Sequence, residues 1–209
     1  MFLPAFRSRV VPVVSFESVD EALPVAEALL RGGIDVIEIT LRRPGGLPAM
    51  ARLRRELPEI CVGAGTLLSA DDLHRARDAG ALFGLSPGAS EDLLDAAATQ
   101  QWPFVPGVMT PSEAMRAREH GFKLQKLFPA EQAGGIRMLR ALRGPLADLQ
   151  FCPTGGIGPD QLTAYLAEPN VRMVGGSWIA PAALISAGDW VGIERLAREA
   201  IAVGAGLTG

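Results

Sequence analysis

Only two lysines occur in this chain, and one of them, Lys126, lies inside an apolar run that is typical of a buried strand. The 20 basic residues include Lys123 and Lys126, so the remaining 18 are arginine (20 − 2). Arginine keeps its proton at usable pH, whereas a desolvated lysine amine is a nucleophile toward carbonyl carbon. Lys126 is therefore the first candidate for covalent chemistry through a Schiff base. Lys123 has the opposite strand parity and is expected to lie away from Lys126, and the same parity turns Gln125 toward the helices. The alternative is that Lys126 has no function and is a lysine left by chance in an arginine-rich chain. The residues around Lys126 must decide between these two interpretations.

A carboxylate on the interior side of an earlier strand is the second candidate. Along Val36-Ile37-Glu38-Ile39-Thr40-Leu41-Arg42, alternate side chains face opposite sides. Glu38, Thr40 and Arg42 share one side, which in a barrel points inward. A buried glutamate is costly unless it is paired or functional. We expect Glu38 to take part in the chemistry, and the alternative is a structural pairing with Arg42 or Lys126.

Two glycine-rich turns follow the last two predicted strands. They are Thr154-Gly155-Gly156-Ile157-Gly158 and Gly175-Gly176-Ser177-Trp178. Glycines let backbone N–H groups converge on an anion, and loops after the seventh and eighth strands of a barrel often hold phosphate. We expect Gly155, Gly156 and Ser177 to form a phosphate cradle. The alternative is a pair of tight turns without a ligand.

Short apolar runs alternate with amphipathic helical runs along the whole chain. Helices are predicted over Val19–Arg31, Leu47–Leu57, Ala70–Ala79 and Pro111–His120, and Ser69 and Thr110 are expected to cap the last two. The pattern predicts a single (β/α)₈ TIM barrel over residues 1–209, with units of about 26 residues. A doubly wound sheet would require a glycine-rich turn after the first strand, and Glu17-Ser18-Val19-Asp20 excludes it. The predicted strands are Val10–Phe16, Asp35–Leu41, Ile60–Gly65, Leu82–Ser86, Phe104–Val108, Lys123–Phe128, Leu149–Pro153 and Val171–Gly175.

Composition excludes several classes of protein. A net charge of −3 offers no basic surface for nucleic acid, and Cys61 and Cys152 have no disulfide or metal spacing. Each cysteine lies in an apolar strand-like run and is expected to be a buried structural thiol. We find no signal peptide and no apolar run long enough for a membrane span, so a cytoplasmic protein is expected. His74 and His120 fall in helical stretches and are expected to be surface or capping residues.

Taken together, the motifs make the chain similar to the 2-dehydro-3-deoxy-phosphogluconate (KDPG) aldolase family, also described as 4-hydroxy-2-oxoglutarate aldolase. The resemblance runs from about Val10 to the C-terminus. Two departures are a short segment before the first strand, which leaves open how that end of the barrel is covered, and Met109, where the family often has a small residue. The motifs that carry it are Glu38-Ile39-Thr40-Leu41-Arg42, Gly63-Ala64-Gly65-Thr66, Ser86-Pro87-Gly88, Lys126-Leu127-Phe128-Pro129-Ala130-Glu131, Cys152-Pro153-Thr154-Gly155-Gly156-Ile157 and Gly175-Gly176-Ser177-Trp178.

The resemblance implies a class I aldolase that needs no metal or cofactor and usually forms a homotrimer. It implies that Lys126 forms the Schiff base and that Glu38 is the general acid and base. The expected substrate is a phosphorylated 2-keto-3-deoxy acid of the Entner–Doudoroff pathway, cleaved to pyruvate and glyceraldehyde 3-phosphate. The unphosphorylated 4-hydroxy-2-oxoglutarate is a further expected substrate, and nucleic acid and membranes are not expected partners. The residues expected around the substrate are Arg42, Thr66, Pro87, Phe128 and Thr154, with Gly155, Gly156 and Ser177 at the phosphate.

Three alternatives stay open. The sequence does not decide between the gluconate-derived and the galactonate-derived epimer as the preferred substrate, because one or two side chains that contact the C4 hydroxyl set this preference. A phosphosugar isomerase or epimerase on the same barrel would not need an inward lysine, and a metal-dependent one would need a His/Asp/Glu cluster, which we expect this chain not to hold. A silent phosphate-ligand binder would keep Glu38 and Lys126 as an ion pair only.

Overall fold

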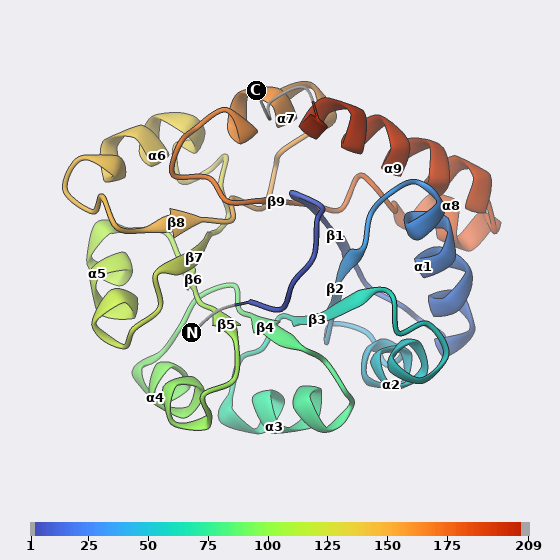
Figure 1. The fold of residues 1–209 in the computed structure, drawn as a ribbon. Coiled ribbons are helices and arrows are strands. Elements are labelled where there is room, and N and C mark those ends of the chain that lie inside the picture. Colours follow the sequence, from blue (N-terminus) through green and yellow to red (C-terminus); the bar gives the residue numbers. More distant parts are fainter. Residues whose placement is uncertain (1–2, 206–209) are drawn as a thin grey trace.

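Parallel strands form a closed ring with helices outside it in the computed structural model, which describes residues 3–205 (Figure 1). One sheet has the order β5-β4-β3-β2-β1-β9 and the other the order β6-β7-β8. The prediction of a (β/α)₈ barrel is confirmed. The strands are β1 Val10–Val14, β2 Val36–Thr40, β3 Cys61–Gly65, β4 Phe83–Leu85, β5 Phe104–Val105, β6 Gly107–Val108, β7 Leu124–Leu127, β8 Gln150–Phe151 and β9 Val174–Gly176.

The fifth barrel strand, predicted as one segment over 104–108, is divided at Pro106 into β5 and β6. Proline has no N–H to donate, so the ladder is interrupted at this residue. β5 pairs with β4, and β6 pairs with β7 through Gly107 opposite Lys126. The carbonyl of Pro106 still accepts a hydrogen bond from Lys126 N at 2.8 Å. The two short pieces therefore occupy one strand position in the ring.

The ring closes where β8 meets β9. Isolated parallel bridges join Phe151 to Val171 and Thr154 to Gly175 at this seam. β9 then pairs with β1 through Val174, Gly175 and Gly176. These bridges bring the loops after β8 and β9 together at the carboxyl end of the barrel.

Helices cover the outside of the ring, and their N-terminal caps match the predicted ones. The side chains of Ser69 and Thr110 accept backbone hydrogen bonds at the starts of α3 and α5. The predicted helix Val19–Arg31 is a 3₁₀ turn, Val19–Glu21, followed by α1. No helix within residues 3–205 is both long and apolar enough to cross a membrane. The helices are α1 Ala22–Arg31, α2 Gly46–Glu56, α3 Ala70–Asp78, α4 Glu91–Gln100, α5 Pro111–Glu119, α6 Gly135–Arg143, α7 Pro159–Leu166, α8 Ala182–Ala187 and α9 Trp190–Ala205.

The chain before β1 crosses the amino-terminal end of the barrel, which answers how this end is covered (Figure 1). The Phe6 ring stacks on Phe83 with centroids 6.0 Å apart. The backbone N–H groups of Arg7 and Ser8 donate to the Asp35 carboxylate at 2.9–3.1 Å. We call residues 3–9 the N-terminal strap, because it is fixed to the barrel by packing and hydrogen bonds without forming a helix.

Strand parity inside the barrel follows the prediction. Ile37 and Ile39 are fully buried in the apolar core that lies between strands and helices, while Glu38 and Thr40 are also buried, each 1% exposed. Burying a large aliphatic side chain contributes about 1.5–3 kcal/mol, so this alternation fixes which side of β2 faces inward. Gln125 on β7 has the opposite parity to Lys126. Its Nε2 donates to the carbonyls of Ala114 and Phe122, both at 2.9 Å, and ties β7 to α5.

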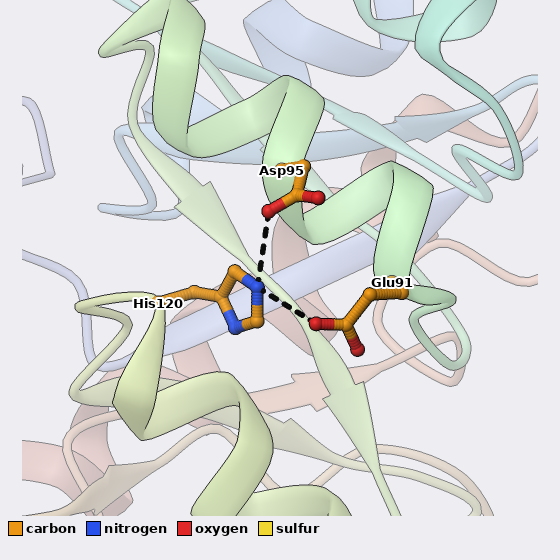
Figure 2. Close-up of side chains that lie close together, drawn as sticks. All are labelled: Glu91, Asp95 and His120. Carbon is orange, nitrogen blue, oxygen red and sulfur yellow. Dashed lines mark ion pairs between the residues drawn. The ribbon is translucent and has the colours of Figure 1, made fainter.

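A cluster of His120, Glu91 and Asp95 lies on the outside of the barrel between α4 and the end of α5 (Figure 2). His120 Nε2 is 3.1 Å from Glu91 Oε1 and 3.2 Å from Asp95 Oδ1. The expectation that the chain holds no His/Asp/Glu cluster was wrong, because the three residues come from two helices and have no local spacing motif. His120 Nδ1 also contacts the carbonyl of Arg116 at 2.9 Å. The prediction that His120 caps a helix is therefore confirmed, and it also forms an inter-helix ion pair.

The His120 ion pairs predict a pH-dependent contribution to stability. The hydrogen bond to the Arg116 carbonyl raises the pKa of His120, and burial opposes the shift, while Glu91 and Asp95 raise the pKa further. A raised folded-state pKa stabilises the fold fully below the unfolded value near 6.5, and this stabilisation is lost as pH rises through the folded value. His120→Asn should therefore cost stability at pH 6, by no more than about 1 kcal/mol because both carboxylates are exposed, and nothing above the folded pKa. Urea unfolding across pH measures this.

His74→Asn is the matched control, since within residues 3–205 His74 contacts Gln100 and no carboxylate. Equal pH profiles for the two variants would show that the ion pairs of His120 contribute nothing.

Candidate active site

Lys126 and Glu38 meet inside the barrel from opposite sides of the ring. Lys126 Nζ donates to Glu38 Oε1 at 2.8 Å, and the two side chains are 5% and 1% exposed. β7 and β2 are not neighbours in either sheet, so both side chains reach inward across the barrel interior. The second carboxylate oxygen, Oε2, is buried and has no hydrogen-bond partner within the described part of the chain. The pair therefore has an acceptor atom to offer to another molecule.

A buried ion pair of this kind is expensive to build. Removing two charges from water costs several kcal/mol per ion, and apolar residues of similar volume are often equally stable or more stable. Oε2, lacking a partner, adds a desolvation cost of about 1–3 kcal/mol. Stability alone gives little reason to keep Lys126 and Glu38 at this place. The arrangement points to a chemical role for the amine and the carboxylate.

Glycines on β3 make room for the carboxylate. A Cβ atom at Gly65 would lie 2.2 Å from Glu38 Oε1 and 2.7 Å from its Cγ. A Cβ atom at Gly63 would lie 2.4 Å from the ring of Phe83. These contacts explain the motif Gly63-Ala64-Gly65, in which Ala64 faces the apolar core and the two glycines face the interior.

The other nucleophile next to the pair is chemically silent. Burial raises the pKa of the Cys152 thiol to about 11, with the positive charge of Lys126 acting against the shift and the charge of Glu38 adding to it. A thiol in this state stays protonated at neutral pH and is a poor nucleophile. The prediction that Cys152 is a buried structural thiol is confirmed. The amine of Lys126 is the nucleophile that this site offers.

The second lysine is outside the site. Lys123 precedes β7, is exposed, and its Nζ lies 3.4 Å from Asp148 Oδ2. This placement agrees with the prediction from strand parity that Lys123 lies away from Lys126.

Four further predicted residues lie at the carboxyl ends of their strands. Thr66 follows β3 and has φ = 61°. A β-branched residue in the left-handed region costs about 1–3 kcal/mol, a strain that is typical of functional positions. Phe128 follows β7, and its ring centroid is 5.4 Å from Lys126 Nζ. Pro87 follows β4 and is half-buried, and Arg42 follows β2 and is exposed, with its Nε donating to Thr40 Oγ1 at 3.3 Å.

The predicted phosphate loops lie side by side. Gly155 and Gly156, after β8, have φ values of 100° and 80°, which only glycine adopts without strain. Thr154 is buried and faces β9, where a Cβ atom at Gly175 would lie 2.3 Å from its Oγ1. Ser177 follows β9 and is exposed. The structure thus brings both loops to the same end of the barrel, with the backbone of Gly155 and Gly156 turned by positive φ.

Hydrogen bonds between Glu131 and α7 support the first of these loops, and the sequence did not predict them. The Glu131 carboxylate accepts hydrogen bonds from Tyr165 Oη and, at 3.0 Å, from Gln161 Nε2. The backbone N–H of Glu131 donates to the carbonyl of Gly155, and a Cβ atom at Gly156 would lie 2.8 Å from Glu131 Cβ. Glu131 therefore fixes the glycine turn against α7. The four-residue spacing of Gln161 and Tyr165 puts both side chains on one face of a helix, and this was the sequence feature that could have indicated a shared partner.

Comparison with known proteins agrees with this arrangement. A family model for KDPG and KHG aldolase matches residues 5–196. The chain is 45% identical to 2-dehydro-3-deoxy-phosphogluconate aldolase of Pseudomonas aeruginosa over 195 residues, which cover 93% of this chain and 89% of the relative. It is also 45% identical to the KHG/KDPG aldolase of Escherichia coli K12, covering 92% of this chain and 90% of the relative.

A solved structure with the same fold carries a trapped reaction intermediate. The crystal structure of KDPG aldolase from Legionella pneumophila superposes with a TM-score of 0.89 at 42% identity, covering 91% of this chain and 93% of the other. In that structure pyruvate was captured at low pH as a covalent carbinolamine intermediate.

The fit of Glu38 against β3 gives a stability prediction. Gly65→Ala would place a methyl group inside the carboxylate and force Glu38 away from Lys126. Overpacking of this kind costs about 1–3 kcal/mol in the free energy of unfolding. Gly88→Ala is the matched control, because a Cβ atom there meets nothing within 4 Å, and it should change stability by less than about 0.5 kcal/mol. Urea unfolding of both variants tests this, and equal stability would contradict the close contact.

Proposed function

The chain belongs to the KDPG and KHG aldolase family, and from this premise we propose that it cleaves 2-dehydro-3-deoxy-6-phosphogluconate through a Schiff base on Lys126. The products are pyruvate and glyceraldehyde 3-phosphate. The observation that carries the assignment of residues is the contact between Lys126 Nζ and Glu38 Oε1 at 2.8 Å, inside the barrel and out of solvent. An amine nucleophile and a carboxylate base in direct contact are the two groups that this reaction requires.

The first half of the reaction builds an electron sink on Lys126. A proton that moves from Nζ to the carboxylate across the 2.8 Å contact leaves a neutral amine. The amine attacks the C2 ketone and gives a carbinolamine, which loses water to become an iminium. Each step needs one proton donor or acceptor near C2, and Glu38 is the titratable carboxylate in contact with the amine. The carbinolamine of the Legionella pneumophila relative supports this route.

The second half breaks the carbon–carbon bond. Glu38, directly or through water, takes the proton of the C4 hydroxyl, the C3–C4 bond breaks, and its electron pair moves into the iminium to give an enamine. Glyceraldehyde 3-phosphate leaves. The enamine is protonated at C3, and water then hydrolyses the iminium to pyruvate and the free lysine. The unpartnered Oε2 of Glu38 supports this shuttle, because one oxygen can hold Lys126 while the other exchanges protons.

The rim residues are assigned to substrate binding in the same proposal. Thr66, Arg42 and Pro87 surround the keto acid end, and Phe128 lies against the reacting carbon chain. The phosphate is bound by the backbone of Gly155 and Gly156 and by the Ser177 hydroxyl, with Thr154 nearby. The strain at Thr66 and the positive φ values of both glycines support these places, since each conformation is costly or restricted to glycine.

Relatives guide the choice of substrate. The Pseudomonas aeruginosa relative is a 2-dehydro-3-deoxy-phosphogluconate aldolase, so we infer that the gluconate-derived epimer is preferred over the galactonate-derived one. The Escherichia coli relative is a KHG/KDPG aldolase, which extends the proposal to cleavage of 4-hydroxy-2-oxoglutarate into pyruvate and glyoxylate. A phosphosugar isomerase is the alternative function for this barrel, and an assay for pyruvate distinguishes the two because an isomerase would release none.

Cellular context is part of the proposal as well. We place the enzyme in the cytoplasm, in the Entner–Doudoroff pathway, as a homotrimer and as one domain over residues 1–209. A KDPG aldolase reaction is a step of that pathway, and the family match over residues 5–196 supports a single catalytic unit.

Trapping with borohydride tests the role of Lys126. Reduction in the presence of pyruvate should fix a covalent adduct that peptide mass spectrometry maps to Lys126, and Lys126→Arg should abolish both the adduct and cleavage, because arginine cannot form the imine. Lys123→Arg is the matched control and should keep both. An adduct on Lys123, or trapping that survives in Lys126→Arg, would refute the assignment.

Replacement of the carboxylate separates proton transfer from imine formation. Glu38→Gln keeps the size of the side chain but loses the base, so turnover of 2-dehydro-3-deoxy-6-phosphogluconate should fall by about 10²–10⁴-fold, the usual contribution of general acid–base catalysis. Slow trapping of pyruvate on Lys126 should persist. A coupled pyruvate assay measures the loss, and unchanged turnover would return Glu38 to a structural role.

A further inference from the structure

A cavity of about 880 Å³ opens at the amino-terminal end of the barrel, opposite the end that holds the predicted substrate residues. It lies between the N-terminal strap and the residues that begin β5, β7 and β8. Its volume falls within the range of small-molecule sites, about 300–1,000 Å³. None of the residues assigned to the aldolase reaction lines it. The cavity is therefore separate from the site described above.

The charged side chains that line the cavity are all positive within the part of the chain that the structure describes. There its wall contains Arg7, Arg9, Lys123 and Arg172 and no aspartate or glutamate, although the chain has a net charge of −3. Arg7 is paired with Asp35, and Lys123 with Asp148. Arg9 and Arg172 have no carboxylate at ion-pair distance anywhere in residues 3–205. Among the described residues, these two guanidinium groups thus have no carboxylate counter-charge beside the opening.

Backbone carbonyls of the described residues hold the Arg9 guanidinium in place and use three of its five N–H groups, which leaves the two on Nη1 for another molecule. Arg9 Nη2 donates to the carbonyls of Leu166 and Val171 at 3.0 and 2.9 Å, and its Nε donates to the carbonyl of Arg172 at 3.3 Å. Burial lowers the pKa of Arg9, and the nearby positive charge of Arg172 lowers it further. A fixed cation next to a second cation is an unfavourable arrangement that a bound anion would relieve.

Most of the rest of the wall is apolar and in part aromatic. Phe104 and Phe122 pack edge to face with ring centroids 5.6 Å apart, but they and Met173 are buried. The half-buried Leu3, Phe6 and Leu124 therefore offer the accessible apolar surface. Flat apolar walls beside a few fixed charges are the usual composition of a site for a small organic molecule.

We propose that this cavity is a second ligand site, which binds a small organic anion through Arg9 and Arg172 and packs the ligand's aromatic or apolar body against Leu3, Phe6 and Leu124. The anionic group is a carboxylate or a phosphate, since guanidinium groups bind both. Such a ligand also contacts the N-terminal strap and fixes it against the barrel.

Fluorescence titration with 8-anilinonaphthalene-1-sulfonate, an aromatic anion, tests the proposal on the folded full-length protein. The dye should bind saturably with one molecule per chain. Arg172→Gln should weaken binding about tenfold, as expected for the loss of one charged hydrogen-bonding partner. Gln150→Trp, which fills the cavity from the start of β8 without changing charge, should weaken it as well. Cleavage activity should be unchanged in both variants.

Controls separate this site from others. Arg143→Gln removes an exposed arginine at the end of α6 that does not line the cavity, and it should bind the dye like the unmodified protein. Lys126→Arg should also bind normally, and loss of dye in that variant would place the dye in the aldolase site and overturn the proposal. Dye binding by Arg172→Gln and Gln150→Trp that is as tight as that of the unmodified protein would overturn it too. Thermal unfolding of each variant confirms that it is folded.

Competition identifies the anionic group. 1-Naphthoate or 1-naphthyl phosphate should displace the dye at about tenfold lower concentration than neutral 1-naphthol, and the better of the two identifies the preferred anion. Displacement by 1-naphthol at the same concentration as both anions would reject the role of Arg9 and Arg172.

Discussion

The contact between Lys126 and Glu38 sets the requirement that the rest of the barrel meets. Two charged side chains, from strands on opposite sides of the ring, must reach the same point in a space that excludes water. The interior must therefore be empty enough to admit them and polar in few other places. Gly63 and Gly65 on β3 provide the space. The aliphatic residues at alternate strand positions face outward and pack against the helices. A chain that packed its interior with large aliphatic side chains would be a stable barrel with no amine at its centre.

The two ends of the barrel are built by different means. At the carboxyl end, loops with positive φ and the strained Thr66 put backbone groups and short side chains around an opening. Glu131, which accepts hydrogen bonds from Tyr165 and Gln161 of α7, supports the loop after β8. At the amino-terminal end the N-terminal strap closes part of the opening with Phe6 and leaves a cationic cavity beside it. The substrate loops and the N-terminal strap thus lie at opposite ends of the barrel, and β2 links them, because it begins next to Asp35 and carries Glu38.

Sequence reasoning predicted the features that depend on local pattern. Alternation along β2 predicted that Glu38 points inward. Alternation along β7 predicted that Lys123 lies away from Lys126 and that Gln125 points outward. It could not predict features that need two distant segments in register. The ion pairs of His120 join two helices, Glu131 binds residues 30 and 34 positions further along the chain, and the glycines of β3 have meaning only beside Glu38 and Phe83. The break at Pro106 lay within a run that reads as one strand, because a missing N–H changes pairing without changing apolar character.

The hydrogen bonds between Asp35 and the N-terminal strap have a practical meaning for anyone who handles this protein. Asp35 immediately precedes β2, and Glu38 lies three residues further along the same strand. A purification handle or fusion partner joined ahead of the strap would leave from the side of the molecule away from the reacting amine. Shortening the chain past Ser8 would instead remove both backbone donors to Asp35 and release the start of the strand that carries Glu38. Immobilisation and fusion designs should therefore extend this end of the molecule and never trim it.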